Sequence, residues 1–310
     1  MINKKIFITG GAGYLGKNLI KRFYQENLIT VFSRDEAKHY FLKKEYPSVK
    51  FVIGDVRNYD LLKRASENHD IGIFAASLKQ IEACDDNYEE AEQIIVRGAF
   101  NSRRVAEENG FEAACFVSSD KSRSATTIYG AMKYIAGESF IINPNTKCRL
   151  STAVYGNILN STGSIIPLIW QHLRKNSEAS LFHSEMTRFL LTVENAIDLI
   201  EIGLRHNSVN VIPICSSFKV KDLMEIFQEE FSLKYKLTQP RMNEKIHEIM
   251  ASSEELPRMI SLEGKGAYLM YQDRYFNAIN LPNNEYSSRD SCVSKGEFKE
   301  LLKANGYFRP

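Results

Sequence analysis

The sequence predicts an α/β fold with a doubly wound parallel sheet and a smaller C-terminal lobe. Two observations support this prediction: short apolar runs alternate with stretches at helical spacing in the first half of the chain, and a glycine-rich turn follows the first apolar run. Strands that alternate with helices form βαβ units, whose parallel sheet is covered on both faces. With 310 residues, the chain is long enough for two domains or for one large unit with an elaborated end.

The predicted strands are short apolar runs rich in β-branched residues, bounded by glycine or polar residues. In the first half of the chain they cover 5–9, 28–33, 49–55, 70–76, 112–119 and 148–156. The segment 88–108 carries apolar residues among charges, which predicts one amphipathic helix. Further along, 208–214 predicts another strand and 220–231 another helix.

Three glycines at G-x-x-G-x-x-G spacing, Gly10, Gly13 and Gly16, follow the first predicted strand in the word TGGAGYLG. The first permits a tight turn, the second lets the backbone approach a pyrophosphate, and the third lets the helix pack closely on the strand. Phosphates would then bind at the positive end of that helix. The motif predicts a Rossmann dinucleotide site, which also includes Thr9, Tyr14 and Leu15.

The end of the second predicted strand indicates which dinucleotide binds. About 20 residues beyond the glycines, a cofactor without a 2'-phosphate usually meets an acidic residue, and this chain has Ser33 and Arg34 there. A hydroxyl and a guanidinium suit a 2'-phosphate, which favours NADP over NAD. The alternative is that Arg34 is a surface charge and Asp35 binds the ribose. By topology alone, the cofactor also meets Asp55, Val56, Ala75 and Ala76.

The domain boundary is predicted where the strand and helix alternation becomes irregular. An NADP-binding Rossmann domain covers 1–165 and returns near 190–215, and a substrate-binding lobe comprises 166–190 and 216–310. No tandem repeat, low-complexity tract or flexible linker separates the two in the sequence.

A second motif predicts the catalytic residues. Tyr129 and Lys133 form Y-x-x-x-K, a spacing that brings both side chains to one helical face. An ammonium nearby favours the phenolate, so the tyrosine can act as a base near neutral pH. Ser119, Asp120 and Lys121 end the fifth predicted strand, at the edge where an open α/β sheet binds ligands. We expect these five residues to form one site; an ordinary strand-end ion pair is the alternative for the last two.

The composition excludes several classes of function. Lys and Arg number 40 and Asp and Glu 38, and the net charge of +2 is too balanced for nucleic-acid binding. The sequence has no apolar run long enough for a membrane span and no signal-peptide pattern, so we expect a cytoplasmic protein. The five cysteines are widely spaced without a C-x-x-C pair, which predicts reduced thiols and no metal site.

Together these motifs resemble the extended short-chain dehydrogenase/reductase superfamily. Within it, the chain is similar to the polysaccharide biosynthesis proteins that act as UDP-N-acetylglucosamine 4,6-dehydratases, of the inverting type that feeds pseudaminic acid synthesis. The matching words are TGGAGYLG, SRDE (33–36), GDVR (54–57), AASLKQ (75–80), SSDK (118–121), YGAMK (129–133), YGNIL (155–159), GSIIP (163–167), MTRF (186–189) and EKIHE (244–248). They span most of the chain in the family's order.

The resemblance implies an intramolecular redox reaction that yields a 4-keto-6-deoxy sugar nucleotide for surface glycan or nonulosonic acid synthesis. Tyr129, activated by Lys133 and linked to Ser119, would take the proton of the sugar's 4-hydroxyl while hydride passes from C4 to NADP+. Lys121 is the candidate base at C5 and Asp120 the candidate acid for the C6 hydroxyl, before NADPH returns hydride to C6. The resemblance also implies a homo-oligomer, at least a dimer.

The resemblance also suggests residues that bind the nucleotide sugar, among them arginines whose planar fork suits a diphosphate. These residues are Lys79, which also borders the cofactor, Asn157, Arg188, Arg241 and Glu244. The chain departs from the family at four places: Ile95 replaces an asparagine, Val154 and Thr162 replace arginines, and Met242 and Asn243 replace Pro-Gly. These departures predict a changed substrate pocket.

Two other functions stay open at this point. A nucleotide-sugar 4-epimerase or 4-ketoreductase would share Tyr129, Lys133 and the cofactor but would not need an acid and a base for elimination. A non-catalytic NADP-binding protein would keep only the fold. The SSDK word favours the dehydratase, because elimination needs one group that accepts a proton and another that donates one.

Overall fold

The structure is a computed structural model that describes residues 1–142, 147–240, 242–276, 281–282 and 284–309. Within these residues, nine strands form one sheet in the order β13-β14-β9-β6-β5-β4-β1-β2-β3. Its strands are β1 (Lys5–Thr9), β2 (Leu28–Ser33), β3 (Lys50–Ile53), β4 (Ile71–Phe74), β5 (Ala113–Val117), β6 (Arg149–Ala153), β9 (Val209–Pro213), β13 (Met259–Leu262) and β14 (Ala267–Tyr271). The strands from β9 to β3 in this order are parallel, and β13 and β14 are antiparallel. The predicted doubly wound parallel sheet is confirmed.

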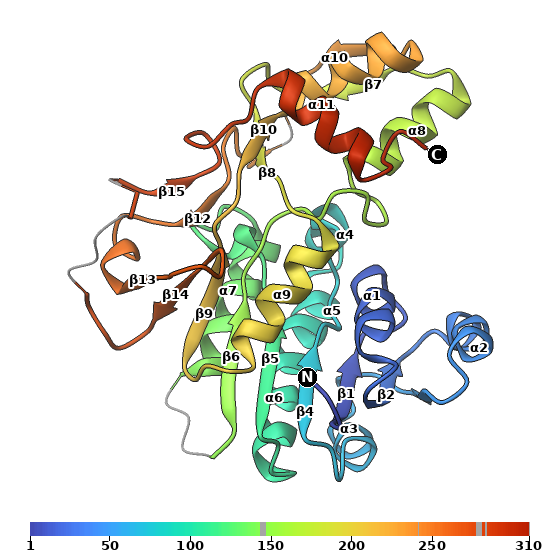
Figure 1. Cartoon of the computed structure of the whole chain (residues 1–310), viewed down its shortest axis with the longest axis vertical. Helices are drawn as coiled ribbons and strands as arrows, with labels where there is room; N and C mark the ends of the chain where they lie inside the picture. Colours follow the sequence, from blue (N-terminus) through green and yellow to red (C-terminus); the bar gives the residue numbers. More distant parts are fainter. Residues whose placement is uncertain (143–146, 241, 277–280, 283, 310) are drawn as a thin grey trace.

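Helices cover both faces of the sheet because side chains alternate along each strand. On β1, Ile6 and Ile8 lie in one core, and Phe7 lies in the other. The first core is closed by α1 (Tyr14–Phe23), α2 (Glu36–Glu45) and α9 (Val193–Gly203). The second is closed by α3 (Tyr59–Ala65), α4 (Ile81–Asp86), α5 (Tyr88–Glu92), α6 (Gly98–Glu108) and α7 (Ile128–Ile141). Figure 1 shows α9 crossing in front of the sheet.

The predicted helix over 88–108 is interrupted, which corrects the sequence prediction. Between α5 and α6, Gln93–Arg97 forms a π-helical turn, whose wider hydrogen-bonding pattern accommodates one extra residue per turn. The turn buries Ile94, Ile95 and Val96. The range predicted as one helix therefore forms three consecutive helical segments.

The C-terminal lobe carries three small two-stranded sheets among the described residues, and its helices lie together at one end of the molecule (Figure 1). Its elements are α8 (Ile165–Lys175), β7 (Ala179–Leu181), β8 (Thr187–Phe189), β10 (Ser217–Lys219), α10 (Val220–Phe231), β11 (Tyr235–Leu237), β12 (Ile249–Ala251), β15 (Tyr286–Ser287) and α11 (Lys295–Ala304). The small sheets pair β10 with β8, β11 with β7, and β12 with β15. Two strands from the range 216–310, β13 and β14, join the large sheet, and the predicted boundary at 165 stays a prediction.

In the part of the chain that the structure describes, no helix is both long and apolar enough to cross a membrane.

Candidate active site

A cavity of about 700 Å³ opens at the carboxyl ends of the parallel strands, where open α/β sheets bind ligands. Residues that follow six of the strands meet there with residues of α7. Of the residues predicted for the site, it is lined by Gly10, Gly13, Tyr14, Leu15, Gly16, Ser33, Arg34, Asp55, Val56, Ala75, Ala76, Lys79, Ser119, Lys121, Tyr129, Lys133 and Asn157. Residues distant in the sequence thus share one pocket.

The glycine turn between β1 and α1 forms a backbone cradle in which two positions, Gly10 and Gly16, have no room for a side chain. Gly10 has φ +71°, and a Cβ there would lie 2.9 Å from the Cα of Ala76. At Gly16, a Cβ would lie 2.3 Å from the Cα of Gly11, so the helix could not approach the turn. No side chain caps the N-terminus of α1 at Gly13. The turn therefore fits a dinucleotide pyrophosphate, which the first-turn N–H groups and the helix dipole would stabilise.

Thr9 supports this turn from beneath. It is buried at the end of β1 and does not line the cavity. Its hydroxyl accepts a hydrogen bond of 3.2 Å from the backbone N–H of Ala76. This bond holds the ends of β1 and β4 together under the cofactor cradle.

Two arginines share one carboxylate at the ends of β2 and β3. The Arg34 guanidinium lies 3.6 Å from Asp55 and is 56% exposed. Arg57 contacts the same carboxylate at 2.7 Å. Burial raises the pKa of Asp55, but its bonds with Arg57 outweigh burial and hold that pKa below the usual value. Because Arg57 already pairs with Asp55, Arg34 is available to a second anion.

The neighbouring polar residues are occupied within the protein. Asp35 caps α2 by accepting from the Lys38 backbone N–H at 3.0 Å, and it also pairs with the Lys38 ammonium at 2.6 Å. The Ser33 hydroxyl lies 2.5 Å from Nε2 of His39. Lys38 lines the cavity and was missed by the sequence analysis. The sequence feature that could have identified Lys38 is its position four residues after Arg34, near the start of α2.

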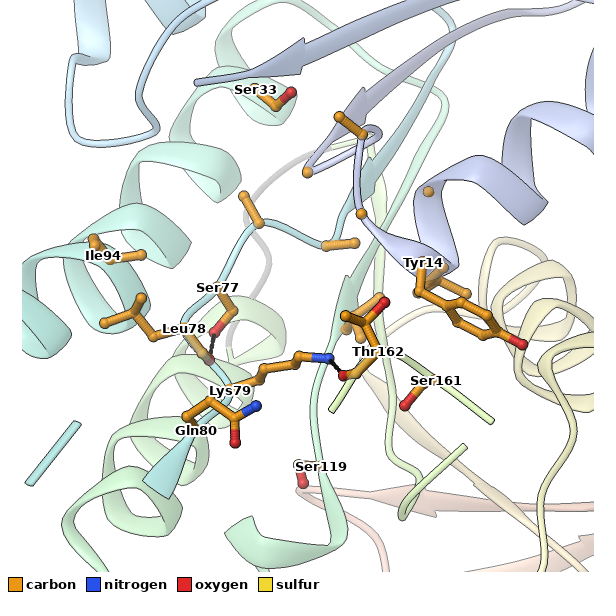
Figure 2. A pocket seen from close by; sticks show the side chains of 18 of the residues that line it. Tyr14, Ser33, Ser77, Leu78, Lys79, Gln80, Ile94, Ser119, Ser161 and Thr162 are labelled. Atoms are coloured by element: carbon orange, nitrogen blue, oxygen red, sulfur yellow. Dashed lines mark hydrogen bonds between the residues drawn. The ribbon is translucent and has the colours of Figure 1, made fainter. Parts of the chain in front are cut away.

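The segment after β4 meets the loop after β6 across the cavity mouth (Figure 2). The Lys79 ammonium donates a hydrogen bond to the carbonyl of Thr162. Burial lowers the pKa of Lys79. Gly163 has φ +75°, and a Cβ there would lie 2.7 Å from Nε2 of Gln80. Thr162, one of the departures from the family pattern, therefore faces the pocket beside Lys79.

Tyr129 and Lys133 lie in the first turns of α7 and are buried. Burial raises the pKa of Tyr129 to about 12, whereas the charge of Lys121 and a hydrogen bond with Ser119 act to lower it. Burial also lowers the pKa of Lys133 to about 8, and its ammonium donates to the Val117 carbonyl at 3.1 Å. The largest cationic influence on the pKa of Tyr129 comes from Lys121, and activation of the tyrosine by Lys133 stays a prediction.

The acid and base candidates lie in a short 3-10 turn, Asp120–Ser122, directly after β5. One Asp120 oxygen accepts from Ser119 at 3.0 Å and from Lys121 at 3.2 Å. Among the described residues its other oxygen has no hydrogen-bond partner, and it lies 2.7 Å from where a Cβ on Gly156 would be. Asp120 is buried behind the cavity wall and does not line it. Burial raises the pKa of this carboxyl group.

Glu248 is a site residue that the sequence analysis missed. It directly precedes β12, it is 3% exposed, and its carboxylate lies 3.3 Å from the Lys121 ammonium. It also lies 3.5 Å from Nε of Arg188. The signal in the sequence was the word EKIHE, which ends on this residue, but nothing there places it beside residue 121.

Two of the residues predicted for the diphosphate and ribose, Arg188 and Glu244, lie apart from the cavity lining. Arg188 on β8 pairs with Glu244 at 2.5 Å, and neither lines the cavity. Arg241 lies outside the described residues. Ile95 and Val154 are buried in hydrophobic cores, so these two departures from the family belong to packing. Neither side chain lines the cavity, and the changed substrate pocket stays a prediction.

The Rossmann sheet, the glycine cradle and the cluster of Ser119, Tyr129 and Lys133 define an enzyme of the extended short-chain dehydrogenase/reductase class. Residues 6–266 match the family model described as polysaccharide biosynthesis protein, and the chain belongs to that family.

Relatives of this chain carry out two different reactions. It is similar to the UDP-N-acetylglucosamine 4,6-dehydratase (inverting) of Campylobacter jejuni, with 30% identity over 95% of this chain and 88% of that one. It is equally similar to the UDP-glucose 4-epimerase of Rickettsia felis, with 30% identity over 97% of this chain and 96% of the relative. The X-ray structure of Pen from Bacillus thuringiensis superimposes with a TM-score of 0.91 and 25% identity, over 99% of this chain and 98% of that chain.

Proposed function

We propose that the protein is an NADP-dependent nucleotide-sugar 4,6-dehydratase that acts on UDP-N-acetylglucosamine. The observation that carries this proposal is the buried Asp120 beside Lys121, on the same turn as Ser119 and next to Tyr129. Oxidation at C4 needs the cofactor as hydride acceptor and, among the protein's acid and base groups, only the tyrosine. Elimination of water between C5 and C6 needs an acid and a base as well, and this pair offers both within one site.

The proposed cofactor fits the residues that line the cavity. The glycine cradle and the uncapped α1 would hold the pyrophosphate, and Arg34 with Lys38 would face the 2'-phosphate. When bound, NADP supplies the oxidant for C4 of the sugar and the reductant for C6. Tyr129 accepts the proton of the 4-hydroxyl, and the charge of Lys121 favours its phenolate.

The elimination is balanced by two proton transfers. Burial raises the pKa of Asp120 and so favours the protonated form, which can donate its proton to the departing C6 hydroxyl. Lys121 takes the proton from C5 as the C5–C6 double bond forms, and one water leaves. In the structure the Lys121 ammonium has an acceptor in each of Asp120, Asn157 and Glu248. It must therefore release a proton before it can act as the base.

The test is to incubate the purified protein with UDP-N-acetylglucosamine without added cofactor and to follow the product by mass spectrometry. We expect the mass of the sugar nucleotide to fall by one water, to a 4-keto-6-deoxy product. A product of unchanged mass and altered stereochemistry would replace the proposal by an epimerase. No reaction with this or other nucleotide sugars, in a protein that still binds NADP, would leave only a binding protein.

A 4-epimerase is the second candidate, and one observation favours it. The charges of Asp120 and Glu248 outweigh burial and hold the pKa of Lys121 above its usual value, so Lys121 is an ammonium in the free protein. A reaction that needs no base at C5 is compatible with that state. The dehydratase remains our proposal, because an epimerase gives no role to the buried carboxyl group of Asp120 beside the reacting tyrosine.

A further inference from the structure

One buried carboxylate of the C-terminal lobe, that of Glu248, contacts the turn that carries the acid and base candidates. Glu248 is held on its backbone by Ser288: its N–H donates to the Ser288 hydroxyl at 2.9 Å, and its carbonyl accepts from the Ser288 N–H at 2.8 Å. Its side chain reaches Lys121, on the 3-10 turn after β5. A residue of the lobe thus touches the candidate base.

The Glu248 carboxylate is the third side-chain partner of the Lys121 ammonium. Lys121 Nζ lies 3.2 Å from Asp120 Oδ1, 2.9 Å from Asn157 Oδ1 and 3.3 Å from Glu248 Oε1. The contacts with Asp120 and Asn157 are hydrogen bonds and the contact with Glu248 is an ion pair, and together the three set the direction of the side chain. Within the described residues, the second oxygen of Glu248 has no hydrogen-bond partner.

The charges around this group come from four parts of the fold. Asp120 lies on the same turn, Tyr129 on α7, Arg188 on β8, and Lys245 on the segment that leads to Glu248. Lys245 is fixed by a bond of 2.7 Å from its ammonium to the Arg123 carbonyl. Burial lowers the pKa of Lys121, whereas the charges of Asp120 and Glu248 raise it, and Glu248 is the one of these two carboxylates that the C-terminal lobe contributes.

We propose that Glu248 is a positioning residue that fixes both the direction and the positive charge of Lys121 through its carboxylate. The role assigned to Lys121 in the reaction rests on the proposed function, whereas the contact itself does not. The residue acts on the chemistry only through Lys121 and is therefore not itself catalytic.

The experiment measures the reactivity of the Lys121 amine without substrate. Wild type and Glu248→Gln are labelled with trace acetic anhydride at about pH 9, where only neutral amine reacts and each unit of pKa changes the neutral fraction about tenfold. Losing an opposite charge at this distance lowers a lysine pKa by about 1 to 3 units. We expect Lys121 labelling, read by mass spectrometry, to become at least about tenfold faster in the variant.

Matched controls separate charge from structure. Glu255→Gln removes another carboxylate of the same lobe, which contacts Arg123 but not Lys121, and it should leave Lys121 labelling unchanged. The exposed Lys21 serves as the internal reference in every sample. Glu248→Asp keeps the charge one methylene further away and should label at an intermediate rate.

The labelling rate of Lys121 tests the positioning role of Glu248 independently of the proposed function. Labelling of Lys121 at the wild-type rate in Glu248→Gln would overturn the positioning role. If circular dichroism shows that this variant does not fold, Glu248→Asp decides in its place, and a wild-type rate there overturns the proposal equally. With an active wild type, Glu248→Gln should also move the Lys121-dependent limb of the pH profile to lower pH. If wild type removes no water from UDP-N-acetylglucosamine, the proposed function falls while the labelling result still stands.

Discussion

Replacing Arg34 with alanine tests the cofactor assignment at the end of β2. In the structure this guanidinium is 56% exposed and lies 3.6 Å from Asp55, a loose contact that a phosphate can displace. Arg57 stays on Asp55 at 2.7 Å after the substitution, so the strand ends remain paired. We therefore expect Arg34→Ala to fold normally and to lose only its interaction with the 2'-phosphate.

The size of the loss follows from the exposure of the side chain. A hydrogen bond to a charged group contributes about 1.5 to 3 kcal/mol. Because more than half of Arg34 is exposed to solvent, the lower end applies, about 1.5 kcal/mol or about tenfold in Kd for NADP. NAD lacks the 2'-phosphate, so its Kd should change little.

Calorimetric titration of NADP and NAD into wild type and variant measures both constants. Arg64→Ala is the matched control, since it removes an exposed arginine that does not line the cavity. An equal loss of affinity for both cofactors would refute the assignment of Arg34 to the phosphate. If NAD binds more tightly than NADP to wild type, the preference for NADP is itself wrong.

Three further predictions follow from the site and the core. Tyr129→Phe should abolish the transient NADPH absorbance that bound substrate produces. The double variant Asp120→Asn with Lys121→Met should keep this absorbance but release no water. Water loss at the native rate in the double variant would exclude the pair as acid and base. Gly156→Ala places a Cβ 2.7 Å from the free oxygen of Asp120, so it should slow dehydration in a turnover assay while calorimetry finds unchanged NADP affinity. Burial lowers the pKa of His69 below 6.5, so the unfolded chain binds its proton more readily and stability should fall as pH drops below that value. His69→Gln should therefore reduce the fall in Tm between about pH 7.5 and about pH 5.5, and an undiminished fall would show that other groups cause it.

Local patterns in the sequence were sufficient for the Rossmann half of the fold. Alternating apolar runs predict the strands because side chains of a strand alternate between two cores, as Ile6 and Phe7 do. The glycine spacing predicts the cofactor turn because positive φ and close backbone approach leave no room for a Cβ at Gly10 and Gly16. Both are requirements of a few neighbouring residues, so they are visible in the sequence.

Contacts between distant segments were decided only by the tertiary structure. The π-helical turn at Gln93–Arg97 depends on how three helical segments pack on the sheet, which apolar periodicity does not report. Val154 is buried in a core and does not line the cavity, which its position in the sequence does not reveal. Glu248 meets Lys121 across the two lobes, 127 positions apart in the chain. The charge state of Lys121 depends on burial and on these partners together. The amino-acid sequence alone could therefore identify Lys121 as the candidate base, but it could not identify Glu248 as a carboxylate that pairs with it.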